Sequence, residues 1–236
     1  MEQLSSHPIS TDRVHGRAIL PPILNINFDR PDPSDVRHIA AVEVPVLSEL
    51  VGPMYTMDRS IRPLASMAAA VCGTVITAKC PPGDNLAMVR ALGEVRAGDV
   101  LIVDAKGFDH WCLGGYRLLE HAQRTSGLAG LIVNGAYRDV EEIEKSGFPV
   151  YATGVAAGSG PKTGPGEINV AVCCGGVVVS PGDIVSASGE GIVIIPRWSV
   201  ASVASAVQGY SVPSEQDIEA FVRNRSAVFD ELCQPK

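Results

Sequence analysis

The chain has 236 residues, of which 46% are hydrophobic and 19% charged, and its formal net charge is −7. An acidic chain lacks the basic face that neutralises phosphates, so we expect no nucleic-acid partner. No run of about 18 apolar residues is present, so we expect no membrane partner. Aromatic residues make up only 5%, and the 24 glycines are scattered. This composition predicts a single α/β domain with a core of small aliphatic side chains.

The N-terminal residues 1–17 are polar and lack the apolar stretch of a secretory signal. The six cysteines form no Cys-x-x-Cys pair, and most lie in apolar runs. We therefore expect reduced thiols and a cytoplasmic location.

Residues 1–34 are predicted to be an irregular arm, because five prolines interrupt regular structure there. Two short helices are expected next, over residues 36–42 and 44–51, the first capped by Pro33-Ser34-Asp35. We divide the chain into an arm with a short helix (1–43), a core domain (44–200) and a C-terminal helical segment (201–236).

Strands and helices alternate in the first part of this core. Strands are expected over residues 73–79, 99–104, 130–133 and 149–152, with helices over 85–92, 115–125 and 139–146. A Gly/Pro-rich loop follows at 157–166. Beyond it, short strands are expected at 170–173, 177–179, 183–185 and 191–195, and helices at 200–208 and 215–232. Interleaved elements followed by clustered strands predict a compact α/β or α+β sandwich.

The most informative segment for chemistry is the end of the strand at 130–133. It runs into Asn134-Gly135 and then presents Arg138 and Asp139 at the start of a helix. Ligands of α/β proteins bind at the carboxyl ends of strands. An arginine matches a carboxylate in two-point fashion, and an aspartate is a hard ligand for Mg²⁺ or Mn²⁺. The alternative is a surface ion pair in which Asp139 caps the helix.

Two weaker signals accompany this pair. Gly114 and Gly115 precede a helix, where exposed amides bind an anion or form only a turn. Lys162, in the Gly/Pro-rich loop, either approaches a far carboxylate of the substrate or is a solvated surface lysine. A Schiff-base role does not suit it, because such a lysine needs a desolvated setting.

The segment from Gly127 to Asp139, GLAGLIVNGAYRD, resembles the signature of the RraA-like family. This family includes class II 4-hydroxy-4-methyl-2-oxoglutarate and 4-carboxy-4-hydroxy-2-oxoadipate aldolases. Further similar motifs follow in the expected order, at residues 80–85 (CPPGDN), 98–104, 147–151, 164–170, 174–183 and 189–196.

The resemblance implies an αββα sandwich assembled as a homotrimer or a dimer of trimers. It also implies a divalent metal, Mg²⁺ or Mn²⁺, and an enolate of the pyruvate type. Arg138 matches the arginine that holds the 2-oxo acid substrate, and Asp139 matches the metal ligand. The turn with Gly114, Gly115, Tyr116 and Arg117 matches the substrate-binding loop.

One position departs from the family pattern. Aldolase members carry an acid there in a Gly-Asp or Gly-Glu pair. Counting back from Arg138 without a gap, its place falls on Arg117, with Tyr116 beside it, and a shift of one or two residues aligns Gly114 and Gly115 instead. Neither alignment supplies an acid. Asp109, His110 and Glu120 are nearby in sequence as substitutes. For the family's second acid, from a neighbouring subunit, the candidates are Glu215, Asp217 and Glu219.

Three hypotheses follow. The first is a metal-dependent lyase on a 2-oxo acid, acting by retro-aldol cleavage or by decarboxylation of a β-keto acid, both through a metal-bound enolate. The second is a non-catalytic regulator that binds a protein partner, as one family member does. The third is a biosynthetic enzyme on the same scaffold with a different substrate, suggested by the unusual segment 108–113 and the Pro-rich arm.

Overall fold

The computed structural model describes residues 21–65 and 70–233; most of the predicted N-terminal arm lies outside this part. The helices are α1 (Pro33–Ala40), α2 (Val44–Val51), α3 (Leu86–Ala91), α4 (Tyr116–Ser126), α5 (Val140–Ser146), α6 (Val200–Gln208) and α7 (Glu215–Leu232). The strands are β1 (Ile23–Leu24), β2 (Arg62–Pro63), β3 (Val71–Lys79), β4 (Asp99–Cys112), β5 (Gly130–Tyr137), β6 (Val150–Val155), β7 (Glu167–Ile168), β8 (Val172–Cys174), β9 (Val177–Val179), β10 (Ile184–Ser188) and β11 (Gly191–Ile195). Short 3₁₀ turns lie at Pro53–Tyr55, Leu92–Glu94 and Arg197–Ser199.

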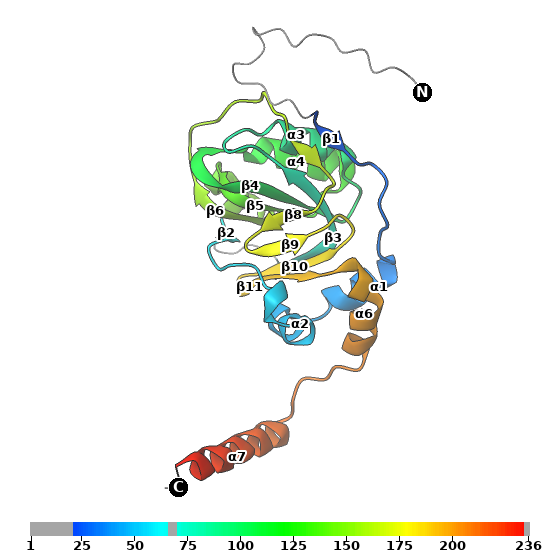
Figure 1. Cartoon of the computed structure of the whole chain (residues 1–236), viewed down its shortest axis with the longest axis vertical. Coiled ribbons are helices and arrows are strands. Elements are labelled where there is room, and N and C mark those ends of the chain that lie inside the picture. Colours follow the sequence, from blue (N-terminus) through cyan, green and yellow to red (C-terminus); the bar gives the residue numbers. More distant parts are fainter. Residues whose placement is uncertain (1–20, 66–69, 234–236) are drawn as a thin grey trace, which may run out of the picture.

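The centre of the fold is a parallel sheet in the order β3-β4-β5-β6 (Figure 1). Its strands are buried on both faces, as expected for a sheet covered on two sides. Along β4, Leu101 and Val103 belong to one hydrophobic cluster and Val100 and Ile102 to another. This period-two alternation divides the core into two compartments.

Helices α3, α4 and α5 cover one face of this sheet, contributing Met88, Leu119 and Ile143 to the first cluster. Strands β8 to β11 cover the other face. Strand β10 pairs antiparallel with both β3 and β11, so the second layer continues from the first.

A third cluster lies on the far side of β10 and β11. There Ile184 and Ile195 pack against Ile39 of α1, Leu47 of α2 and Val203 of α6. Figure 1 shows α1, α2 and α6 beside β10 and β11, opposite α3 and α4. The order helix, sheet, sheet, helix confirms the predicted αββα sandwich. These contacts also place α1 and α6 in the same packed body as residues 44–200.

Several boundaries differ from the sequence prediction, and β5 and β6 also run further than predicted, to Tyr137 and Val155. Local contacts explain the differences at α1 and β4. Helix α1 begins at Pro33, because Asp32 is its N-cap and accepts the Ser34 amide at 2.7 Å. Strand β4 continues to Cys112 instead of ending at residue 104. It does so through two shifts of register against β5, with Lys106 and Gly107 at positive φ.

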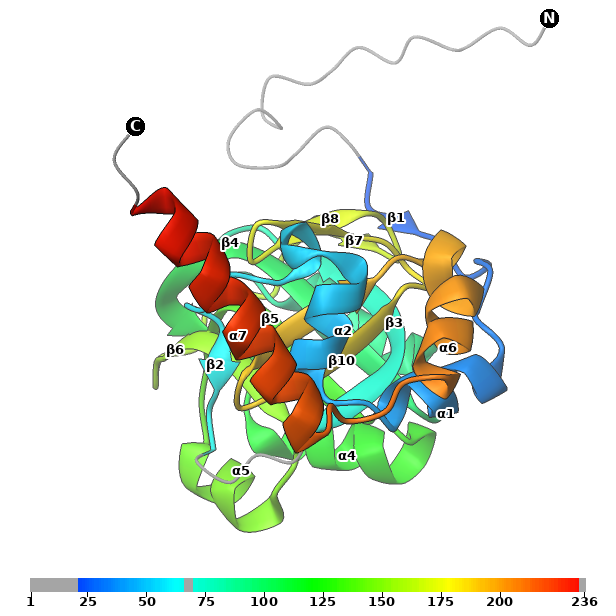
Figure 2. The ribbon, with the colours of Figure 1, turned by 90° about the horizontal axis from the view of Figure 1, so that it is seen from below.

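The C-terminal helix α7 has no buried residue among those that the structure describes. Figure 1 shows it as a separate rod beyond α6, and in Figure 2, seen from below, it lies in front of the body. Its side chains are exposed throughout. A capping box of Ser214 and Asp217 begins it. Among the described residues, no helix has the length and apolar character needed to cross a membrane.

Candidate active site

The carboxyl ends of the parallel strands surround a cleft of about 700 Å³. Its lining includes all six predicted site residues, Gly114, Gly115, Tyr116, Arg117, Arg138 and Asp139. Asn85, Glu120, Glu142, Ser159 and Lys162 complete the polar part of the wall. These residues follow β3, β4, β5 and β6 in turn. Parallel strands therefore bring together side chains far apart in the sequence.

The turn at Gly114 and Gly115 is bonded to the end of β5. The amide of Arg138 donates to the Gly114 carbonyl at 3.2 Å, and the Tyr137 hydroxyl donates to the Gly115 carbonyl at 3.0 Å. Tyr137 is fully buried, and this burial raises the pKa of its hydroxyl, which therefore stays protonated as a donor. The start of α4 is thus fixed relative to the β5–α5 turn.

Asp139 occupies the N-cap position of α5 in a left-handed conformation, with φ 63°. Its carboxylate does not cap that helix. Instead, Oδ2 accepts the Tyr116 amide at 2.9 Å, at the start of α4. The alternative considered from the sequence was that Asp139 caps α5. In the structure its carboxylate instead bonds the first amide of α4. Gly115 makes this contact possible, because a Cβ there would lie 2.1 Å from Asp139 Oδ2.

Arg138 lies beside this carboxylate and is partly exposed to the cleft. Its Nε is 3.6 Å from Asp139 Oδ1, and one terminal nitrogen donates to the Ala157 carbonyl at 3.3 Å. The Nε is buried and has no hydrogen-bond partner in the structure.

Asp84 fixes the Gly/Pro-rich loop that carries Ser159 and Lys162. Its Oδ2 accepts the Thr163 amide at 2.6 Å and the Gly164 amide at 3.0 Å, while Oδ1 accepts the Leu86 amide at 2.8 Å. Burial alone would raise the pKa of this carboxyl, but the three amide bonds lower it below its usual range. Sequence reasoning did not assign this role, although Asp84 lies within the family-like motif at 80–85.

We expect Asp84→Asn to destabilise the protein at neutral pH by ~1–3 kcal/mol, because a carboxylate binding several amides is replaced by a neutral group. The pKa of the Asp84 carboxyl is lower in the folded protein than in the unfolded chain. The stabilisation is therefore present above about pH 4 and is lost as the pH falls through the pKa of the folded protein. Thermal denaturation of both proteins from pH 7 to pH 3 measures it. The two melting temperatures should converge in acid; a constant difference would contradict this role.

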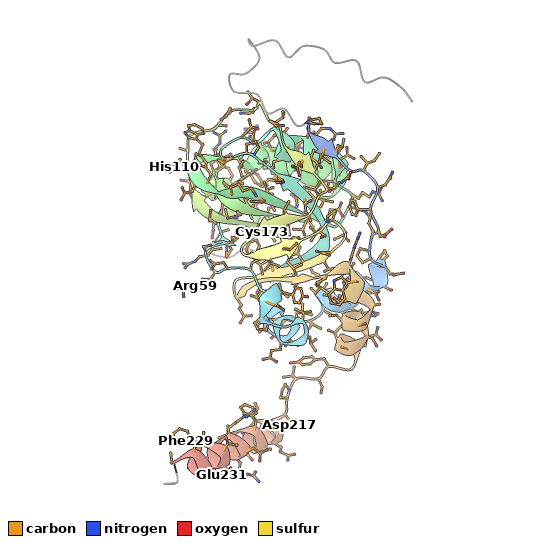
Figure 3. The ribbon with its side chains drawn as sticks, in the orientation of Figure 1. Arg59, His110, Cys173, Asp217, Phe229 and Glu231 are labelled. Carbon is orange, nitrogen blue, oxygen red and sulfur yellow. The ribbon has the colours of Figure 1, made fainter. Side chains whose placement is uncertain are left out.

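Not every residue predicted as a substitute for the family's acids lines the cleft. Glu120 lines it, whereas Asp109 and His110 are not among its lining residues. His110 instead packs edge-on against Phe108. Figure 3 shows Asp217 on α7, outside the body and away from His110 on β4. Glu215, Asp217 and Glu219 therefore lie away from the cleft of their own chain.

A family model described as RraA-like, Aldolase/RraA, matches residues 35–194 of this chain. The chain belongs to the RraA-like family. Its motifs fall on this fold as the resemblance implies, with the signature segment 127–139 forming β5 and the turn into α5.

Relatives of this RraA-like protein carry different functional names. It is 32% identical over 182 residues to a protein of Halalkalibacterium halodurans named "Putative 4-hydroxy-4-methyl-2-oxoglutarate aldolase", covering 77% of this chain and 86% of that one. Among solved structures, a Streptomyces coelicolor protein titled an unusual member of the RNase ES inhibitor RraA family matches with TM-score 0.70 and 26% identity, covering 84% and 99%. The RNA-processing inhibitor RraA from Thermus thermophilis matches with TM-score 0.59 and 29% identity, covering 66% and 93%. The family thus includes a named aldolase and named inhibitors.

For the divalent metal that the resemblance implies, the cleft offers the Asp139 carboxylate at the position of the family's ligand. No group of three or more Asp, Glu, His or Cys side chains gathers anywhere in the described residues. Asp139 Oδ2 is engaged by an amide, and Oδ1 faces no hydrogen-bond donor closer than Arg138 at 3.6 Å. Mg²⁺ is commonly bound by one or two carboxylates, with substrate and water completing its shell. The donor set fits such a site.

Proposed function

We propose that this protein is a divalent-metal-dependent lyase that breaks a carbon–carbon bond in a 2-oxo acid. The cleavage is either retro-aldol or the decarboxylation of a β-keto acid. The observation that carries this proposal is the pairing of Arg138 with Asp139 in a cleft at the start of α4. The named aldolase among its relatives supports the same reaction class.

In this proposal, Arg138 binds the carboxylate of the 2-oxo acid through its planar guanidinium. The turn with Gly114, Gly115 and Arg117 lines the same cleft and would add backbone donors for that carboxylate. Asp139 would hold Mg²⁺ or Mn²⁺ through its carboxylate. The ion would supply positive charge to the oxygen that becomes negative when the bond breaks. Glu120 and Glu142 line the cleft, and in this proposal they would move protons.

Pyruvate release tests this proposal directly. The full chain is incubated with 4-hydroxy-4-methyl-2-oxoglutarate or with oxaloacetate, each with added Mg²⁺ or Mn²⁺ and with EDTA as control. We expect pyruvate from at least one substrate, abolished by EDTA. Metal-independent release, or none from either substrate, contradicts the proposal.

Arg117 favours a second candidate function, that of a regulator without catalysis. This cation lines the cleft where the aldolase pattern calls for an acid. The outcome that supports a regulator is a stable complex with a protein partner, together with no metal-dependent turnover. A biosynthetic enzyme with another substrate would instead show turnover in a wider screen of 2-oxo acids.

We also propose that the chain assembles as a homotrimer or a dimer of trimers, in which α7 packs on a neighbouring copy. A stripe of large apolar side chains follows one face of α7 and is exposed: Ile218, Phe221, Val222, Val228, Phe229 and Leu232. Such a stripe needs a partner surface. We place this assembly in the cytoplasm, since all six cysteines are free.

We expect light scattering after gel filtration to give at least three times the 24.8 kDa chain mass. Phe221→Glu should lower the mass of the assembly, because it places a charge on the apolar stripe. Arg223→Glu, on the opposite face of the helix, is the matched control and should leave the mass unchanged. A monomeric full chain, or equal effects of the two variants, contradicts this role of α7.

A further inference from the structure

Trp111 lies near the end of β4, in the segment 108–113 that the sequence marks as unusual. Its side chain is 45% exposed and packs edge-on against Phe108, with 5.5 Å between the ring centres. Trp111 belongs to none of the three hydrophobic clusters that form the core. The packing of the core therefore does not explain this large side chain.

Three glycines leave the space that the indole ring of Trp111 occupies. A Cβ on Gly83 would lie 2.7 Å from Trp111 Cε3, and a Cβ on Gly160 would lie 3.1 Å from the same atom. A Cβ on Gly158 would be in ordinary contact with Cδ1, at 3.6 Å. Gly83 lies in the turn between β3 and α3, whereas Gly158 and Gly160 belong to the Gly/Pro-rich loop. The ring thus contacts both segments, and their lack of side chains lets it approach the backbone closely.

Backbone contacts fix the same loop next to Trp111. The amide of Cys112 donates to the Gly158 carbonyl at 2.7 Å, and Cys112 pairs with Ser159 in an isolated parallel bridge. Ser159 and Lys162 both line the cleft, and Lys162 Nζ donates to Ser159 Oγ at 3.3 Å. The indole ring therefore packs against a segment that forms one wall of the cleft.

This loop also orients the arginine of the cleft. Ala157 directly precedes Gly158, and its carbonyl accepts a hydrogen bond from Arg138 Nη1 at 3.3 Å. The Arg138 side chain is 42% exposed, and its Nε is 3.6 Å from Asp139 Oδ1. A long, partly exposed side chain has several rotamers, so a bond at its tip decides which one is populated. A shift of the loop would therefore turn the guanidinium.

We propose that Trp111 is a positioning residue for Arg138: its ring holds the loop 157–160, and the Ala157 carbonyl in that loop holds the guanidinium. The inference rests on the proposed function in one respect, that Arg138 binds the carboxylate of the substrate. Trp111 is not among the residues that line the cleft, so it takes no part in the chemistry. Its loss is expected to weaken binding of the carboxylate and to leave bond cleavage largely intact.

Steady-state kinetics of pyruvate release separate this role from a purely structural one. Trp111→Ala should raise KM by about tenfold or more and leave kcat within about threefold, because carboxylate binding is weakened. Trp111→Phe keeps an aromatic ring against the glycines and should restore most of the parent KM. The control is Trp198→Ala, at the chain's other tryptophan, which is 78% exposed. A Trp111→Ala variant that melts earlier but keeps the parent KM overturns the inference.

A pair of glycine variants tests the loop while the tryptophan stays in place, should Trp111→Ala not fold. A Cβ on residue 160 would overlap the Gly83 carbonyl oxygen and crowd the ring, so Gly160→Ala must shift the loop. Gly158→Ala adds the same methyl group at an ordinary contact distance of 3.6 Å. We expect Gly160→Ala to raise KM and Gly158→Ala to match the parent chain. Equal KM values for the two variants contradict the inference.

The fluorescence of Trp111 reports on the same coupling without turnover. Trp198→Phe leaves Trp111 as the single tryptophan of the chain, and oxalate is then titrated in with Mg²⁺. We expect a saturable change in emission that is lost when Arg138→Gln is added. Unchanged emission, when oxalate inhibits pyruvate release, overturns the inference. A change in emission in a chain that releases no pyruvate defeats the proposed function and leaves the role of Trp111 intact.

Discussion

Asp139→Asn is expected to lower kcat for pyruvate release by at least about 100-fold, because the variant removes the charge that holds the metal. An asparagine oxygen still accepts the Tyr116 amide, so the start of α4 should keep its position. The variant therefore removes the negative charge of residue 139 without changing the shape of its side chain. Steady-state kinetics with saturating Mg²⁺, beside a thermal melt, measure it.

The matched control is Glu141→Gln, two residues away on α5. Glu141 faces Lys145 at 3.8 Å and is not among the cleft residues. Removing its charge should leave kcat within about twofold, as expected for an exposed ion pair of little energy. If Asp139→Asn behaves like Glu141→Gln, then Asp139 is not the metal ligand.

Gly115→Ala is expected to reduce kcat/KM by about 100-fold, because a 1 Å displacement of a catalytic group has effects of this size. The backbone of Gly115 has φ −132°, which alanine adopts without strain. The added methyl carbon would nevertheless lie 2.1 Å from Asp139 Oδ2, so the carboxylate must move. The variant tests the position of Asp139 without changing its chemistry.

Gly189→Ala is the control for that substitution. A Cβ at Gly189, in the turn between β10 and β11, meets no atom within 4 Å. This variant should match the parent chain in both activity and melting temperature. Full activity of Gly115→Ala would show that the reaction does not depend on where Asp139 lies.

Much of the site could be predicted from the sequence because it is local. Arg138 and Asp139 follow directly from a buried strand and precede a helix, so their placement depends on one strand, one turn and one helix start. The glycines at 114 and 115 were also identifiable as a turn before a helix. What the local pattern missed is that Asp139 bonds to the start of α4 instead of α5. That contact joins residues 23 positions apart.

Other parts of the site depend on pairing between distant segments. Asn85, Arg138 and Ser159 meet only because β3, β4, β5 and β6 are parallel and in register. The pattern of apolar residues within a single strand or helix does not reveal the register between these strands. The strands β1, β2 and β7 have two residues each, too few for an alternating pattern. Helix α7 carries an apolar stripe that stays exposed in the described part of the chain, so no pattern within the helix shows what covers it.

A crystal structure of the full chain with Mg²⁺ and oxalate, a stable analogue of the pyruvate enolate, tests the roles of Arg138 and Asp139 directly. The proposed chemistry predicts oxalate in the cleft with one carboxylate on the Arg138 guanidinium. It also predicts Mg²⁺ bound to Asp139 Oδ1 and to oxalate oxygens. Oxalate bound away from Arg138, or Mg²⁺ bound without Asp139, would contradict the account.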